Sequence, residues 1–191
     1  MAAPTDTKRR AVYADLERIP DTMVAEIVDG ELFASPRPRP RHSVAASVLG
    51  TDLNAPFQQG RGGPGGWWIL DEPELHFGED VLVPDIAGWR RDRLPVMPDE
   101  AYFTLAPDWI CEVLSPHNER HDRVRKLPVY ARVGVSYAWL VDPLERTAEA
   151  LRLEGGQWSA VRTCRGDEVF RAEPFAAVEI DLLPLWGESR V

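Results

Sequence analysis

Hydrophobic positions along the chain switch between helical and strand-like spacing, which is typical of a domain that mixes helices with a sheet. Residues Ala11 to Ile19 carry apolar side chains four and three positions apart, and His42 to Asn54 repeats the 3.6-residue pattern. A third helix is predicted from Asn118 to about Val133, where Pro128 should kink the helix or restart it. The pattern therefore predicts three helices spread over the chain.

Strand-like runs lie between these helices. Ala25 to Ala34 reads as a hairpin, because Asp29-Gly30 is a strong two-residue turn signal between apolar flanks. Glycine pairs after residue 150 separate further strand-like runs and predict a C-terminal hairpin or meander. The remaining predicted strands are Trp67–Leu70, Glu74–Phe77, Val81–Trp89, Trp109–Leu114 and Tyr137–Val141.

The segment SPRPRPR, Ser35 to Arg41, interrupts this pattern and is called the Pro-Arg segment below. Its alternating prolines predict a stiff, extended chain with no regular element. Apolar strands with helices before and after them predict a single α/β or α+β domain built on a mixed sheet.

The length of 191 residues fits one domain, which we expect to span residues 11–191 after a loose segment of residues 1–10. No run approaches the ~20 apolar residues of a membrane span, and the first residues lack the apolar core of a signal peptide. We therefore expect a soluble, cytoplasmic protein with no membrane contact. The two cysteines exclude a disulfide framework and a four-cysteine zinc site.

The charge balance narrows the possible partners. The 22 Lys and Arg residues against 31 Asp and Glu give a net charge of -9, which argues against nonspecific coating of DNA by a basic surface. Nucleic acid stays possible as a substrate, because a metal-dependent nuclease needs carboxylates at its site. Only Lys8 and Lys126 are lysines; the other basic residues are arginines.

Two acids stand in apolar, strand-like surroundings, Asp85 in VLVPDIA and Glu112 in WICEVL. A buried carboxylate is costly unless a cation or a hydrogen-bonding partner offsets the cost. Acids on neighbouring strands would converge, and such hard oxygen ligands suit Mg²⁺ or Mn²⁺. The alternative is that each acid pairs with an arginine or lies on a solvated face.

A basic partner follows within a few residues of the second acid. Asp122 and Lys126 share a helix face at i and i+4, so the ammonium could hold a water or offset phosphate charge. The alternative is an ordinary ion pair on a surface helix. His117 and His121 lie nearby, but two histidines at this spacing with no other His or Cys cluster argue against zinc.

Several short motifs, taken in order, resemble the Uma-two family of restriction endonucleases, a branch of the PD-(D/E)XK nuclease superfamily. The resemblance runs from about residue 24 to residue 143. It rests on EIVDGEL at 26–32, Ser35-Pro36, His42, Val83–Ile86, Pro107-Asp108, Glu112–Pro116, Asp122, Lys126, Tyr130, Gly134-Val135 and Trp139–Pro143.

The resemblance implies a restriction-endonuclease-like core, with a central mixed β-sheet flanked by helices. It also implies that Asp85 and Glu112 bind the divalent metal. The usual lysine position two residues after the second acid holds Leu114, so the resemblance assigns the lysine role to Lys126 on the following helix.

Three further residues are accessory candidates. His42 could face the site or simply begin a helix, and Glu26 could complete the metal shell or pair within the hairpin. Asp122 could orient Lys126.

The residues and the resemblance together predict a Mg²⁺- or Mn²⁺-dependent endonuclease, and the resemblance implies DNA as its substrate and a homodimer. The candidate phosphate contacts are Arg37, Arg39, Arg41 and Arg123. Two alternatives remain open: a catalytically silent nuclease fold that binds a partner or nucleic acid, and an unrelated hydrolase of small phosphates.

Overall fold

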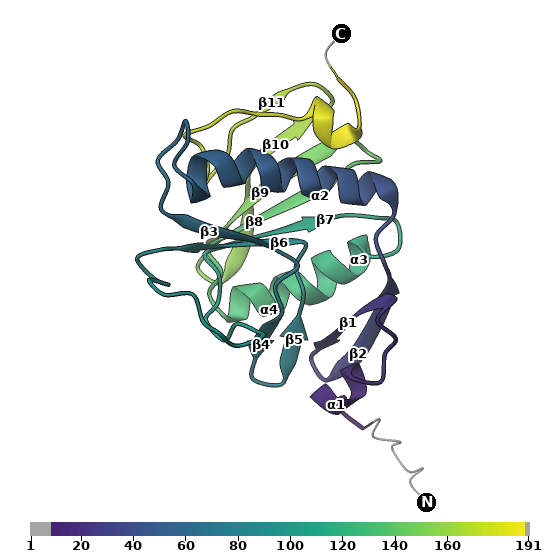
Figure 1. The fold of residues 1–191 in the computed structure, drawn as a ribbon. Helices are drawn as coiled ribbons and strands as arrows, with labels where there is room; N and C mark the ends of the chain where they lie inside the picture. Colours follow the sequence, from purple (N-terminus) through teal and green to yellow (C-terminus); the bar gives the residue numbers. More distant parts are fainter. Residues whose placement is uncertain (1–8, 190–191) are drawn as a thin grey trace, which may run out of the picture.

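A six-stranded sheet forms the centre of the molecule in the computed structural model, which describes residues 9–189 (Figure 1). Its strand order is β10-β9-β8-β7-β6-β3, and only the β7–β8 pair is parallel. A helical crossover joins these two strands, as a parallel connection requires. The strands are β3 Trp67–Asp71, β6 Ile86–Arg90, β7 Trp109–Val113, β8 Tyr137–Asp142, β9 Thr147–Glu154 and β10 Gln157–Arg165.

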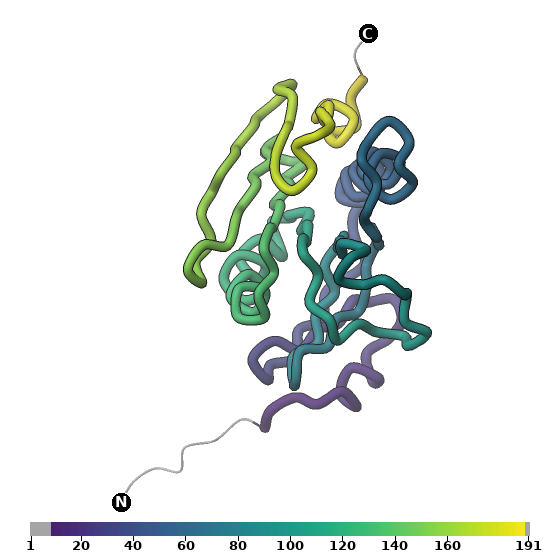
Figure 2. The backbone as a smooth tube through the Cα atoms, turned by 90° about the vertical axis from the view of Figure 1, so that its left-hand side faces the viewer, coloured from purple at the N-terminus to yellow at the C-terminus, as the bar shows by residue number. Residues whose placement is uncertain are grey.

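A smaller antiparallel sheet, of order β2-β1-β5-β4, lies at the end of the molecule opposite the C-terminal segment (Figures 1 and 2). Its strands are β1 Met23–Val28, β2 Glu31–Pro36, β4 Leu75–Phe77 and β5 Asp80–Leu82. The hairpin between β1 and β2 is confirmed. Asp29 and Gly30 both adopt positive φ, 52° and 79°, as a tight hairpin turn requires.

Helices cover both faces of the central sheet, which confirms the predicted α/β architecture. On one face, Ala45, Leu49 and Leu53 of α2 pack against Trp109 and Trp139. The crossover helices cover the other face. The helices are α1 Tyr13–Leu16, α2 Pro40–Leu53, α3 Glu119–His121 and α4 Leu127–Arg132, with a short 3₁₀ helix at Leu183–Trp186.

Two stretches of π-helix interrupt the longer helices, at Asn54–Gln58 after α2 and at Asp122–Lys126 between α3 and α4. A proline lies in or just after each, Pro56 and Pro128. Because proline has no N–H to donate to the helix, the hydrogen-bond pattern changes there. The predicted restart near Pro128 is confirmed, and the widened turn carries Asp122 and Lys126.

Three local predictions need correction. The run 81–89 is not one strand: β5 ends at Leu82, and the chain crosses at 83–85 into β6 of the other sheet, because Pro84 cannot extend a ladder. The Pro-Arg segment is not wholly irregular, because β2 runs to Pro36 and α2 begins at Pro40. Proline is tolerated at a strand edge and in the first helical turn. The first helix is short, Tyr13–Leu16.

The predicted C-terminal hairpin is formed by β9 and β10, and β11 Val169–Phe170 pairs with β12 Ile180–Asp181 beyond it. Phe175 and Trp186 from this region join the core beside α2. Cys111 and Cys164 are both buried, free thiols. Within residues 9–189, every helix is too short or too polar to cross a membrane. Most of the segment predicted to be loose, residues 1–8, lies outside the described residues.

Candidate active site

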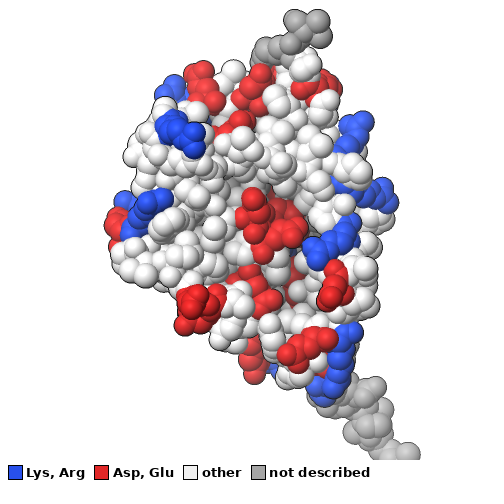
Figure 3. Space-filling model, viewed as in Figure 1, with Lys and Arg blue, Asp and Glu red and all other residues white. Residues whose placement is uncertain are grey.

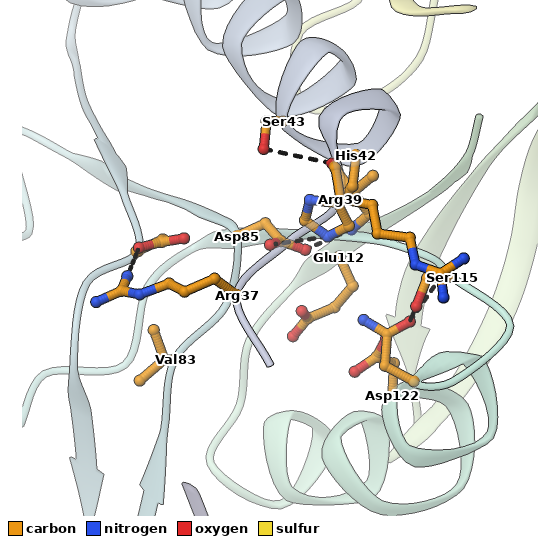
Figure 4. A network of polar contacts seen from close by, with 12 residues as sticks. Arg37, Arg39, His42, Ser43, Val83, Asp85, Glu112, Ser115 and Asp122 are labelled. Carbon is orange, nitrogen blue, oxygen red and sulfur yellow. Dashed lines mark hydrogen bonds and ion pairs between the residues drawn. The ribbon is translucent and has the colours of Figure 1, made fainter. Parts of the chain in front are cut away.

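The site forms where the chain passes from the small sheet to the central sheet (Figure 4). Asp85 lies at this crossing, directly before β6, and Glu112 lies in the neighbouring strand β7. Ile110 and Leu114 pack on the crossover-helix side of the sheet. Glu112 shares their side, because alternate residues of a strand face the same way.

The carboxylate of Asp85 is fixed by two neighbours. Its Oδ2 accepts the backbone N–H of Val113 at 2.7 Å, and its Oδ1 lies 3.2 Å from Nε2 of His42. His42 projects from the first turn of α2 and is buried. Burial alone lowers the pKa of His42, but the hydrogen bond and charge of Asp85, with that of Glu112, outweigh it and raise the pKa.

Lys126 lies at the centre of the cluster and is only 3% exposed. Its Nζ is 2.8 Å from Oε1 of Glu26, 2.9 Å from Oε1 of Glu112 and 3.0 Å from the carbonyl oxygen of Val83. An ammonium has three N–H donors, so these acceptors occupy all of them. Asp122 lies 3.9 Å away. The alternative of an ordinary surface pair is therefore wrong.

Glu112 shares this one lysine with Glu26 and also accepts the hydroxyl hydrogen of Tyr130 at 2.7 Å. Burial raises the pKa of Glu112, which is 2% exposed, and the charges of Asp85 and Glu26 add to the rise. Lys126 lowers it only in part, so the pKa is about 7. Both contacts of Glu112 use Oε1, which leaves Oε2 as the oxygen for a further ligand.

Glu26 in β1 is the counterpart of Glu112. Burial raises the pKa of Glu26, but Lys126, His121 and the N–H of Val83, which donates to Oε1 at 2.7 Å, lower it to about 2. His121 Nε2 lies 3.4 Å from Oε2 of Glu26. Lys126 contacts both acids at similar distances, so the lower pKa of Glu26 comes from its additional partners and the higher pKa of Glu112 from the repulsion of Asp85 and Glu26.

Asp122 is 2% exposed, and its Oδ2 has no hydrogen-bond partner. Burial, followed by the charge of Glu112, raises the pKa of Asp122 well above its ordinary value. The cluster therefore holds the carboxyl groups of Glu26, Asp85, Glu112 and Asp122 against one lysine. This excess of acid in a buried place fits a divalent cation near Asp85 and Glu112.

The acids of the cluster do not form a complete metal cage in residues 9–189. Within residues 9–189, no group of three or more His, Cys, Asp or Glu side chains is arranged to hold a metal ion. Mg²⁺ commonly binds through one or two carboxylates and keeps several waters. Asp85 and Glu112 therefore fit Mg²⁺ or Mn²⁺ as a partial ligand set.

Two hollows meet at the cluster. The apolar hollow, about 630 Å³, lies between the Pro-Arg segment and the start of the crossover helices, with Phe33 and Leu144 among its walls. The α2 groove, about 590 Å³, runs along α2 past Asp71 and Glu72. Figure 3 shows acidic side chains gathered in a hollow below α2, in the middle of that face.

The candidate phosphate contacts differ in position. Arg37, Arg39 and Arg41 line the apolar hollow beside the cluster. Arg37 lies 3.6 Å from Glu72, and Arg39 lies 3.3 Å from His117. Arg123 lines neither hollow and instead pairs with Glu119 and Glu149. The structure thus brings together one set of predicted residues: Glu26, His42, Asp85, Glu112, Asp122 and Lys126, with Arg37, Arg39 and Arg41 at the edge.

The sequence reasoning gave no role to Tyr130, to the Val83 carbonyl or to Glu72. A signal for Tyr130 was present, because Asp122, Lys126 and Tyr130 recur every four residues on one helix face. The Val83 carbonyl had no such signal, because it depends on how the chain crosses between the sheets.

The fold is a nuclease-like α/β fold, with a mixed sheet between helices and the cluster of acids and one lysine at its edge. The chain belongs to the Uma2 family, whose model, described as "Putative restriction endonuclease", matches residues 11–184. This confirms the resemblance drawn from the sequence.

Among solved structures, the chain is similar to one titled as a "putative nuclease belonging to DUF820" from Anabaena variabilis ATCC 29413. The TM-score is 0.74 at 23% identity, covering 93% of this chain and 98% of that chain, so this likeness shows the fold. The comparison with curated proteins gives no match.

Proposed function

We propose that this protein is a metal-dependent endonuclease that hydrolyses phosphodiester bonds, with DNA as its substrate. One observation carries the proposal: Asp85, Glu112 and Lys126 come from three separate parts of the chain and converge in one cluster. Family membership and the fold of the structural neighbour support a nuclease.

Asp85 and Glu112 would hold Mg²⁺ or Mn²⁺, which when bound polarises a phosphate oxygen and lowers the pKa of a bound water. His42 and the N–H of Val113 hold the two oxygens of Asp85 in place. Tyr130 does the same for Glu112. The residues around the two carboxylates therefore fix their orientation before substrate arrives.

Lys126 would supply positive charge where negative charge develops on the phosphate in the transition state. Its three donors contact Glu26, Glu112 and the Val83 carbonyl. A phosphate oxygen or a water would therefore replace one of these partners. The neutral carbonyl of Val83 is the least costly to exchange, because its contact with the ammonium lacks the attraction of a full negative charge that the two carboxylates supply.

The Pro-Arg segment would bind substrate phosphates through Arg37, Arg39 and Arg41, with Arg123 as a further candidate outside the two hollows. A homodimer would supply the two active sites that cleavage of both strands needs, and sedimentation velocity would test it. A cytoplasmic location remains a prediction.

The competing function is a silent nuclease fold that only binds nucleic acid or a protein partner. It is favoured by the full engagement of Lys126 in ion pairs and a hydrogen bond. Cleavage assays separate the two functions.

The test is to incubate the protein with plasmid DNA and with single-stranded circular DNA, in Mg²⁺ or Mn²⁺ and in EDTA, beside Asp85→Ala and Lys126→Ala. We expect cleavage by the wild type that needs the metal and is lost in both variants. Cleavage that persists undiminished in both variants would overturn the site assignment. The absence of cleavage by the wild type, with binding retained, would favour the silent fold.

A further inference from the structure

The two hollows differ in chemistry. The whole catalytic cluster lines the apolar hollow, and the α2 groove meets that hollow at one edge of the cluster. His42, Asp85 and Glu72 line both, so a chain-like ligand could pass from one hollow to the other across Asp85. A ligand that occupies both must present different groups to the two sides.

The apolar hollow has one apolar side that suits a flat, weakly polar group, while the catalytic cluster and the arginines of the Pro-Arg segment form the rest of its lining. Val24 and Phe33 of the hairpin, Leu114 after β7 and Leu144 after β8 supply its apolar walls. The rings of Phe33 and His121 pack against each other with 4.2 Å between their centroids, and both line the hollow. Any of the nucleobases can stack on an aromatic side chain, so this contact does not depend on the nucleotide sequence.

The α2 groove suits a sugar-phosphate backbone. Ser43, Ser47 and Thr51 recur every four residues and form one exposed stripe that lines it, about 6 Å apart along the helix axis. Hydroxyl groups are common phosphate contacts. The hydroxyls of Ser43 and Thr51 donate to the carbonyl oxygens of Arg39 and Ser47, so these two would rotate to reach a phosphate. Asp71, Glu72 and Asp85 also line the groove, and the Asp71 carboxylate reaches α2 beside Gly50, so phosphates would lie toward the Ser43 end of the stripe.

The acidic lining of the α2 groove is held close to the cluster by the backbone. Glu72 adopts φ of 45°, which is uncommon for a residue other than glycine, and its N–H donates to the carbonyl of Asp85 at 3.0 Å. This strained turn keeps the acidic lining next to Asp85. Strain of this kind is retained where the surrounding structure requires it.

The depth of the cluster limits which nucleic acid can enter. Glu112 and Lys126 are almost fully buried, and the Pro-Arg segment lines the hollow above them. In a duplex the bases stay stacked inside the helix, so an apolar hollow beside the scissile phosphate is useful only to an unpaired base. Extruding a paired base costs a few kcal/mol, and an already unpaired base avoids that cost.

The geometry points to an unpaired strand as the substrate, with one base in the apolar hollow and the adjoining backbone along the hydroxyl stripe of α2. This inference rests on the proposed nuclease function and names the substrate class for the same site. The arginines of the Pro-Arg segment complement the charge of such a strand at the edge of the hollow.

The test compares one labelled oligonucleotide in three forms: single-stranded, fully paired, and paired to a complement that leaves a few central bases unpaired. We measure kcat/KM in Mn²⁺ and, in parallel, binding in EDTA by fluorescence anisotropy. We expect kcat/KM for the single-stranded and gapped forms to exceed that for the full duplex by at least about tenfold.

Two pairs of variants separate the effect of changing a hollow from the effect of the substitution itself on the fold or charge. Ser35→Trp fills the apolar hollow, whereas Ala34→Trp places the same ring on the opposite face of β2. We expect the first to lower kcat/KM on single strands about tenfold or more and the second to change it less than about twofold. Ser47→Asp adds a charge in the α2 groove, and Val44→Asp adds the same charge on an exposed part of α2 outside it. If Ser35→Trp does not fold, this second pair carries the test.

The outcomes are distinguishable. Equal cleavage of duplex and single strand, or equal effects of the two members of each pair, would overturn the inference. Tighter binding of single strands without any cleavage, weakened by Ser35→Trp but not by Ala34→Trp, would support the inference while the nuclease proposal fails. If the protein neither binds nor cleaves any of the three forms, both the inference and the nuclease proposal are overturned.

Discussion

Glu26 and Glu112 share one cation, Lys126, and their other neighbours decide the pKa of each. Lys126 lies within 3 Å of both Glu26 and Glu112, yet the pKa of Glu26 is about 2 and that of Glu112 about 7. Glu26 has the additional N–H of Val83 and the nearby His121, whereas Glu112 faces the charges of Asp85 and Glu26. Glu112 is thus the carboxylate with the most to gain from a bound metal.

The lysine itself is the first residue to change. Lys126→Arg should lower cleavage at least about a hundredfold, because a planar guanidinium cannot occupy a buried place shaped for a compact ammonium. Turnover is measured beside thermal melting, with Arg125→Lys as the control at a neighbouring exposed position. Equal activity of Lys126→Arg and the wild type would remove the lysine from the mechanism.

A second prediction concerns pH and stability at Asp52, away from the cluster. Partial burial, then repulsion from Asp181, raises the pKa of Asp52 in the folded protein. A carboxyl with a raised folded pKa destabilises the fold when ionised in both states and has no effect when protonated in both. Asp52→Asn should therefore raise Tm at neutral pH.

That gain should shrink as the pH falls through the folded pKa and vanish below the unfolded value of about 3.9. Thermal melting across this range checks it, with Asp99→Asn at an exposed position as the control. A gain that is constant with pH would show that charge is not its cause.

At this scale the sequence identified the residues whose chemistry is unusual for their setting. Asp85 and Glu112 stood out as acids in apolar runs, and the resemblance assigned Lys126; all three lie together. The partners that tune them could not be predicted, because the hydrogen bond of Tyr130 and the charge sharing with Glu26 depend on how distant elements pack.

At the scale of helices and strands, the points where an element is interrupted place the residues of the cluster. Pro84 divides a run that reads as one strand into β5 and β6, and this places Asp85 between two sheets. The π-helical turn at Asp122–Lys126 carries two buried charged residues of the cluster. Sequence periodicity predicted the helix but not the widened turn, because side-chain spacing says little about which carbonyl each N–H reaches.

Two glycines test the packing of the central sheet and of α2: Gly88 in β6 and Gly50 in α2. A Cβ at Gly88 would lie 3.2 Å from Ile69 and Trp109 side-chain atoms in the core, so Gly88→Ala should destabilise the fold by about 1–3 kcal/mol. At Gly50 in α2 the nearest atom, 3.1 Å away, is the end of the Asp71 side chain, which can move.

Gly50→Ala should therefore be neutral, or stabilising by up to about 1 kcal/mol, because alanine favours helix. Urea denaturation of both variants measures the difference. A destabilisation of Gly50→Ala as large as that of Gly88→Ala would contradict the described packing.

The proposed phosphate contacts of the Pro-Arg segment predict how the affinity for nucleic acid depends on salt concentration. If Arg39 and Arg41 contact phosphates, Arg39→Ala and Arg41→Ala should each reduce the slope of log affinity against log salt by about 0.7 for single strands. Arg123→Ala should change the slope less, because that side chain pairs with Glu119 and Glu149. Anisotropy titrations at several salt concentrations measure the slopes; unchanged slopes in both Pro-Arg variants would contradict the contacts.

At the scale of the whole molecule, the site exists because two sheets and a crossover meet. The small sheet supplies Glu26, the central sheet supplies Glu112, and α2 and the crossover supply His42 and Lys126. Composition alone suggested an acidic protein ill suited to DNA. The fold explains part of that balance, because several acids gather around one site where a cation fits.

The most direct measurement is cleavage of a labelled oligonucleotide in Mn²⁺ by the wild type, Glu112→Gln and Glu149→Gln. Glu149 is an acid outside the cluster that pairs with Arg123, so its variant controls for the loss of one charge. We predict that Glu112→Gln loses at least about a hundredfold in kcat while Glu149→Gln and the wild type cleave alike. Undiminished cleavage by a folded Glu112→Gln variant would contradict the proposed site.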